Sequence, residues 1–115
     1  MDEPSFAYDV WDDQLARVLP GKVLLVGISY IDTDGSLIEQ QQFFGSVETV
    51  HSRQGILLNL AGRRAGERYN LPPDMRAIRE AEPGEYRLRS TGEMVVDPDY
   101  TVTISLNKRP RDAGA

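Results

Sequence analysis

The sequence of 115 residues contains no cysteine and a single histidine, His51, and these two absences remove several kinds of chemistry. Without cysteine the chain forms no disulfide, no thiolate zinc site, no iron–sulfur cluster and no cysteine nucleophile. One histidine leaves only carboxylates as further metal ligands. His51 and Ser52 are neighbours in a predicted turn, so their side chains point apart and are a poor nucleophile–base pair. We therefore expect no catalytic residue, no metal site and no cofactor.

Long apolar runs and a basic N-terminus are also missing. The longest apolar stretch, Val23 to Ile28, is interrupted by Gly27 and has the length of a strand. A membrane helix needs roughly twenty apolar residues. The N-terminal residues Met1 to Pro4 are acidic, whereas a secretory signal begins with positive charge. These features predict a small cytoplasmic protein of bacterial type that does not bind membranes.

Composition and charge are those of one ordinary soluble domain. Lysine and arginine number 13 against 18 aspartate and glutamate residues, so the formal net charge is -5, and 40% of the residues are hydrophobic. A chain of this length buries enough surface to form one core without a covalent crosslink. We expect a single domain over residues 1–107. The tail over 108–115, KRPRDAGA, lacks apolar residues and is expected to be disordered.

The N-terminal part of the domain has the pattern of one amphipathic helix. Tyr8, Trp11, Leu15 and Leu19 recur at helical spacing, which predicts a helix over about 8–19. Pro20 and Gly21 end it. A helix this short is not stable alone in water, so its apolar stripe must pack on the rest of the domain or on a partner.

After residue 21 the pattern is that of strands. Segment 22–31 is apolar on both faces and predicts a central strand, covered on one side by the core and on the other by the helix. Gly45 lies in the middle of the next strand, over 37–50, and predicts a sharp bend there. Segment 74–78 has room for one helical or 3₁₀ turn. Segment 100–107 alternates most regularly and is expected to close the sheet. The further predicted strands are 55–61, 67–71, 85–89 and 93–96.

The order of these segments resembles that of a known group of folds. A helix is followed by VLLVGISYID, a turn at Asp34 and Gly35, then FFGSVETV, another turn and GILLNL. Over residues 8 to about 71 this order is similar to that of the SH3-like and Sm-like small β-barrels. The resemblance implies a mainly β fold: a small, strongly bent antiparallel barrel behind one N-terminal helix. For the Sm-like members it also implies RNA binding.

Aromatic and arginine side chains are the candidate binding surface. Phe43 and Phe44 are adjacent in one strand and face opposite sides, so one of them needs cover from the helix, a partner or solvent. The helix is the simplest cover. Arginine suits planar, bidentate partners such as carboxylate or phosphate. The candidate surface comprises Phe43, Phe44, Arg53, Arg63, Arg64, Arg68 and Tyr69.

Three functions remain open on the sequence. The first is a non-enzymatic protein-interaction module that binds a protein partner or self-associates, through sheet edges or the Phe43 and Phe44 face. The second is binding of RNA or single-stranded nucleic acid through the arginines, with Tyr69 as a stacking platform. The net charge of -5 opposes it. The third is an acidic immunity or inhibitor protein that masks a basic partner with Asp9, Asp12 and Asp13.

Overall fold

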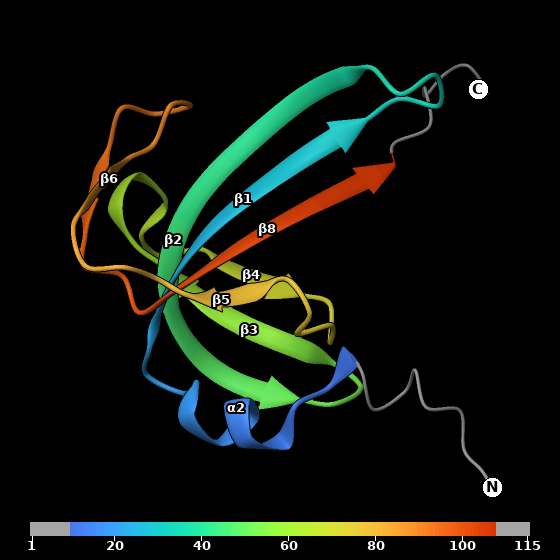
Figure 1. Ribbon diagram of the computed structural model, residues 1–115. Helices are drawn as coiled ribbons and strands as arrows, with labels where there is room; N and C mark the ends of the chain where they lie inside the picture. Colours follow the sequence, from blue (N-terminus) through green and yellow to red (C-terminus); the bar gives the residue numbers. More distant parts are fainter. Residues whose placement is uncertain (1–9, 108–115) are drawn as a thin grey trace, which may run out of the picture.

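A six-stranded sheet dominates the computed structural model, which describes residues 10–107 (Figure 1). Its strand order is β4-β3-β2-β1-β8-β5, and β6 and β7 form a separate two-stranded hairpin. The mainly β fold with one short N-terminal helix, predicted from the sequence, is confirmed. The elements are α2 (Asp13–Val18), β1 (Val23–Ile31), β2 (Leu37–His51), β3 (Gly55–Leu60), the 3₁₀ turn η1 (Gly62–Arg64), β4 (Arg68–Leu71), β5 (Ile78–Glu80), β6 (Glu85–Arg87), β7 (Met94–Val96) and β8 (Tyr100–Asn107).

Within the described residues the predicted helix is interrupted at residues 11 and 12, and α2 begins at Asp13. Asp12 has an extended backbone, and its carboxylate accepts hydrogen bonds from the backbone N–H groups of Gln14 and Leu15, at 3.0 and 3.1 Å. This cap satisfies N–H groups that have no partner within a helix, so the helix starts directly after Asp12. The predicted start at Tyr8 lies outside the described residues, as does the tail over 108–115.

The bend in β2 is where the strand exchanges one partner for another. Residues up to Ser46 pair with β1, and residues from Gly45 onward pair with β3. The long curve of β2 is the clearest feature of Figure 1. A Cβ on Gly45 would lie 2.2 Å from the Asn59 carbonyl oxygen, so only glycine lets the two backbones come this close. The predicted bend at Gly45 is confirmed.

Strand β8 lies inside the sheet and does not close it. It pairs with β1 in parallel, from Leu24 opposite Tyr100 to Ile31 opposite Asn107, and with β5 on its other side. The sheet is therefore mixed, and the expectation of an antiparallel one was wrong at this pair. Within residues 10–107 the sheet ends at β4 and at β5 and is not closed into a barrel. Local alternation could not reveal this arrangement, because it does not specify which strands pair.

The helix covers one end of the core, below the curved end of β2 in Figure 1. Leu19 is fully buried in the main hydrophobic cluster, and Trp11 and Leu15 pack against that cluster. The predicted stripe is thus confirmed. Leu24 of β1 belongs to the same cluster, so the helix lies on the core side of β1. The expectation that it covers the opposite face of β1 was wrong. Packing on the hydrophobic cluster removes the apolar stripe of the helix from water.

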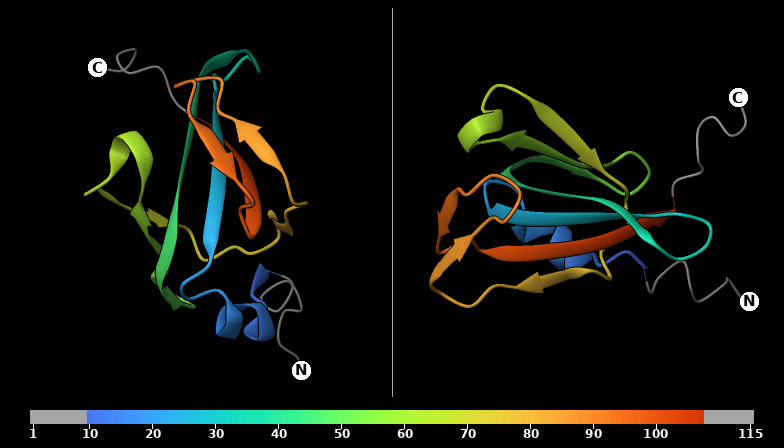
Figure 2. Two further views of the ribbon diagram at one scale, coloured as in Figure 1. Left: turned by 90° about the vertical axis from the view of Figure 1, so that its left-hand side faces the viewer. Right: turned by 90° about the horizontal axis from the view of Figure 1, so that it is seen from above.

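The chain between β4 and β8 holds the largest difference from expectation. Segment 74–78 forms a single turn, closed by a hydrogen bond of 3.2 Å from the Ile78 N–H to the Met75 carbonyl, which agrees with the single turn that was expected. The chain then continues as β5, a strand that the sequence pattern did not predict. Only three residues pair, opposite Tyr100 to Val102, so no periodicity announces the strand. Figure 2 shows the β6–β7 hairpin packed beside the outer face of the sheet. Leu88 and Val95 are buried there.

Candidate functional site: the arginine cluster and the open edge of β8

Three of the predicted surface residues come together in the fold. The Phe43 ring is buried, and its centroid lies 4.8 Å from that of Tyr69. The Arg64 guanidinium lies over the Phe43 ring at 4.9 Å, within the range of a cation–π contact. Exclusion of water raises the pKa of the Tyr69 hydroxyl, and the adjacent Tyr30 hydroxyl raises it further. The Phe43 and Tyr69 rings therefore pack against each other at an interplanar angle of 45°, which leaves less of Tyr69 to act as a platform for bases.

The arginines beside this cluster hold carboxylates of the same chain. Arg64 lies 2.9 Å from the Glu67 carboxylate. Arg68 approaches both oxygens of Glu48, with Nε 3.1 Å from Oε1 and Nη2 donating to Oε2 at 3.2 Å. Each of these guanidinium groups is already matched with one negative charge. The local field available to attract a phosphate is correspondingly smaller.

The other predicted arginines are not part of this cluster. Arg53 lies in the β2–β3 turn, two residues before Gly55, whereas Arg68 pairs with Asn59 toward the other end of β3. Arg63 lies in η1, where its backbone N–H donates to the Glu93 carboxylate at 2.7 Å. The fold therefore divides the candidate arginines between two ends of β3.

Phe44 is covered by a different part of the chain from the one expected. Its ring lies against Gly62 of η1, where an added Cβ would be 2.8 Å from Phe44 Cε1. The hairpin is fastened over this region, because Gln42 Oε1 accepts a hydrogen bond from Ser90 and Glu93 accepts one from Arg63. Helix α2 packs on the opposite, Phe43 side of the sheet. The Phe43 and Phe44 surface is thus largely internal.

Acidic residues of the N-terminal segment serve the helix itself. Asp12 caps α2, and Asp13 Oδ1 accepts a hydrogen bond from Trp11 Nε1 at 3.1 Å. The third residue of the predicted acidic surface, Asp9, lies outside the described residues. This arrangement gives the two described carboxylates structural roles.

His51 also has a structural role. Its Nδ1 accepts hydrogen bonds from the backbone N–H groups of Arg53 and Gln54, both at 3.1 Å. These bonds close the β2–β3 turn. The ring nitrogen is therefore engaged by the turn and is not directed at a serine hydroxyl.

One edge of β8 has no partner strand over part of its length within residues 10–107. Strand β5 pairs with β8 only as far as Val102. From Thr103 to Asn107, no strand within residues 10–107 pairs with the edge of β8 that faces away from β1. Five residues of backbone, about 17 Å of strand, thus present hydrogen-bonding groups to an incoming chain.

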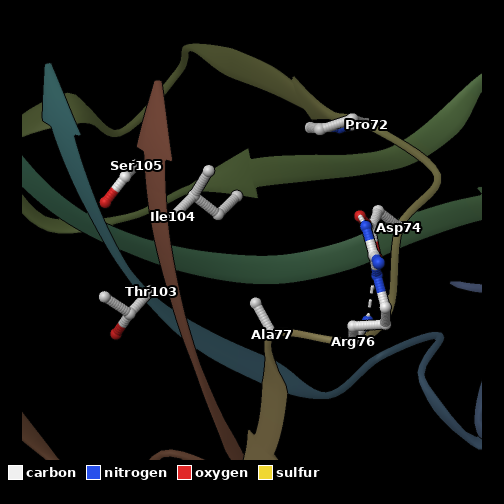
Figure 3. Close-up of a pocket in the computed structure, with 7 residues that line it drawn as sticks. All are labelled: Pro72, Asp74, Arg76, Ala77, Thr103, Ile104 and Ser105. Atoms are coloured by element: carbon white, nitrogen blue, oxygen red, sulfur yellow. Dashed lines mark hydrogen bonds and ion pairs between the residues drawn. The ribbon is translucent and has the colours of Figure 1, made fainter. Parts of the chain in front are cut away.

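A pocket of about 300 Å³ lies along this open edge (Figure 3). After β4 the chain leaves the sheet, and the segment from Pro72 to Ala77 that leads to β5 forms the wall of the pocket opposite β8. Figure 3 shows Ile104 pointing from β8 into the pocket, toward Pro72 and Ala77, while Thr103 and Ser105 point away. The floor is therefore apolar, and backbone groups of a strand edge form one side.

A fixed ion pair forms the polar part of the pocket wall. The Asp74 carboxylate accepts hydrogen bonds from the backbone N–H and the Nε of Arg76, each at 3.0 Å, and from Nη2 at 2.6 Å. The hydrogen bonds from Arg76 lower the pKa of Asp74. Because the two charges are matched, the pocket carries no marked preference for a charged ligand.

The open edge of β8 lacks the features that usually protect a sheet edge. Natural edge strands carry charges, proline or bulges that discourage another chain from pairing. Residues Thr103 to Asn107 contain none of these, and Leu106 is 37% exposed. By contrast, the edge strand β4 carries Arg68, and β5 carries Arg79 and Glu80. The uncharged composition of 103–107 is visible in the sequence, but its position at an edge is not.

The chain matches no protein-family model, no curated protein and no solved structure. In the part of the chain that the structure describes, no group of three or more histidine, cysteine or acidic side chains is placed to hold a metal ion. None of the described helices has the length and apolar character to cross a membrane. The geometry of the fold is therefore the basis for assigning a function.

Proposed function

We propose that this chain is a non-enzymatic protein-interaction module that receives an extended polypeptide at the open edge of β8. The observation that carries the proposal is the apolar pocket beside Thr103 to Ser105, within the unpaired part of the β8 edge. An added strand gains main-chain hydrogen bonds from the edge, and alternate side chains of that strand enter a neighbouring pocket. The pocket floor at Ile104 lies on the same face as such side chains.

Binding of synthetic extended peptides tests this function. The probe is an array of fluorescein-labelled octapeptides that lack proline, alternate polar and apolar residues, and vary one apolar position. We expect a subset to bind the full chain, with dissociation constants of about 10–100 µM in fluorescence anisotropy. Ala77→Phe fills the pocket and is expected to weaken binding at least about tenfold.

A matched variant separates loss of the pocket from a general effect of phenylalanine. Ala65 is exposed beside η1 and does not line the pocket, so Ala65→Phe should bind peptide like the unmodified protein. Circular dichroism and thermal unfolding report whether both variants remain folded. The proposed function is wrong if no peptide of the array binds, or if folded Ala77→Phe and Ala65→Phe bind equally well.

The likeness to SH3-like and Sm-like barrels also remains a proposal. Its support is the bent strand β2, which is shared between β1 and β3. Nucleic-acid binding has weaker support, because Arg64 and Arg68 are paired with carboxylates and the Tyr69 ring packs against Phe43. Nucleic-acid binding would be favoured if the protein retains nucleic acid and loses it when Arg63→Glu and Arg64→Glu are combined.

A further inference from the structure

We infer that the strand received at the open edge of β8 is β8 of a second copy of this chain, paired antiparallel about a two-fold axis at Ser105. This inference rests on the proposed function, since it requires the edge to accept a strand. It names the occupant, its direction and its register. The argument depends on the pattern of the edge, on the pocket and on one exposed leucine.

The edge is complementary to itself. In a two-fold antiparallel pair centred on Ser105, Thr103 lies opposite Asn107 of the second copy and Ile104 lies opposite Leu106 of the second copy. The five residues read polar, apolar, polar, apolar, polar, so reversing the strand preserves the pattern. Like residues therefore meet on each face of the joined sheets, as an isologous interface requires.

The same surface carries both a pocket and a side chain to fill it. Leu106 is 37% exposed and lies on the same face of β8 as Ile104. In the proposed register, Leu106 of the second copy is opposite Ile104, at the apolar floor between Pro72 and Ala77. A pocket of about 300 Å³ has room for a leucine side chain and for part of the strand that carries it. Symmetry repeats this contact in the other direction.

Charge does not oppose pairing at the edge itself. Thr103 to Asn107 contain no ionisable side chain, whereas each whole chain has a formal net charge of -5. Two copies repel at long range, and added salt screens that repulsion. Association should therefore tighten as salt concentration rises, which is opposite to the behaviour of a complex held by arginine and phosphate.

The size of the contact indicates a reversible dimer. A stable interface buries about 800 Å² on each partner, more than five paired residues with one inserted leucine can provide. We expect a dissociation constant on the order of 100 µM. Light scattering coupled to size exclusion, over a range of protein concentrations, should show a mass that rises from monomer toward dimer.

Paired leucine variants test the inserted side chain. Leu106→Ala should weaken the dimer about tenfold, because it removes the side chain that enters the pocket. Leu37 is more exposed, at 58%, and lies outside the proposed pairing, so Leu37→Ala should leave the dimer unchanged. The inference is overturned if the chain stays monomeric at millimolar concentration, if both variants behave alike, or if salt weakens the dimer.

Single cysteines test the register, because the chain has no cysteine of its own. Directly opposite residues in antiparallel strands lie close enough for a disulfide. Under mild oxidation Ser105→Cys should form a covalent homodimer. Thr103→Cys and Asn107→Cys should each crosslink poorly alone and should form a heterodimer when mixed. Homodimers of all three variants in equal yield, or of none, would overturn the register.

The results also separate this inference from the proposed function. A monomeric chain that still binds array peptides, and loses them on Ala77→Phe, overturns the second copy as occupant but keeps the edge as a binding site. A chain that neither associates nor binds any peptide overturns both. Dimerisation that is unaffected by Ala77→Phe places the contact elsewhere and overturns the inference.

Discussion

A methyl group added at Gly45 should destabilise the protein far more than one added at Gly27, although both glycines lie inside adjacent strands. A Cβ at Gly45 would lie 2.2 Å from the Asn59 carbonyl oxygen and 2.8 Å from Leu60 Cα. Both contacts are to backbone, which cannot rotate away as a side chain can. The Cβ of Gly27→Ala would meet no atom within 4 Å.

The expected cost follows from how far the two strands must separate. Carbon and oxygen atoms need more than 3 Å, so β2 and β3 would have to move apart by at least about 1 Å at Gly45. The hydrogen bond from the Ala61 N–H to the Phe44 carbonyl, 2.9 Å long, lies beside this point and would stretch beyond bonding distance. Overpacking costs about 1–3 kcal/mol, and each lost hydrogen bond costs about 1 kcal/mol. We expect Gly45→Ala to lower the free energy of unfolding by about 3 kcal/mol.

Urea unfolding followed by tryptophan fluorescence measures the difference, with thermal unfolding as a second readout. Gly45→Ala should lower the melting temperature by about 15 °C. Gly27→Ala should be neutral or raise the free energy of unfolding by up to about 1 kcal/mol, because alanine restricts the unfolded chain. The reasoning fails if the two variants have the same stability, or if Gly45→Ala costs less than about 0.5 kcal/mol.

Three further predictions concern hydrogen bonds and one hydroxyl group. Glu93→Ala removes the acceptor of the Arg63 N–H and should lower the free energy of unfolding by about 1–2 kcal/mol. An unchanged urea midpoint would mean that this hydrogen bond does not hold the hairpin in place. His51→Ala removes the acceptor of two turn N–H groups and should cost about 1 kcal/mol in the same assay, and His51→Asn, which keeps an acceptor, should recover part of it. The pKa of Tyr69 is raised above its usual value of 10.0 in the folded protein, so its stabilising contribution is complete below that value and is lost as pH rises through the folded pKa. An ultraviolet titration should show a tyrosine ionisation above pH 10.0, and Tyr69→Phe should abolish that step.

Several elements follow directly from local sequence. The apolar segment 22–31 and the segment 37–50 were predicted as strands from residue type along the chain, and β1 and β2 occupy nearly these bounds. Gly45 marked the bend because a residue without Cβ inside a strand indicates close approach of backbone. The stripe of Trp11, Leu15 and Leu19 required an apolar surface, and it packs on the core.

Features that depend on particular hydrogen bonds or on contacts between distant segments were not predicted. Strand β5 is three residues long and is recognisable only by its hydrogen bonds to β8. Helix α2 begins at Asp13 because the Asp12 carboxylate accepts hydrogen bonds from the first backbone N–H groups of the helix. The apolar spacing along the sequence does not show that hydrogen bond. One of the two adjacent phenylalanines was expected beneath the helix, but the cover over Phe44 comes from η1 and from a hairpin about 50 residues later in the chain.

The sequence by itself determined that this protein is mainly β, that its core forms without disulfides, and where its principal strands begin and bend. Those properties depend on residue type and on spacing along the chain, which are local. Only the tertiary structure decided that β8 lies parallel to β1, that its outer edge is open from Thr103 to Asn107, and that Pro72 and Ala77 face Ile104 across a pocket. These relations join residues about 25 to 75 positions apart, and local periodicity carries no information about which distant segments meet.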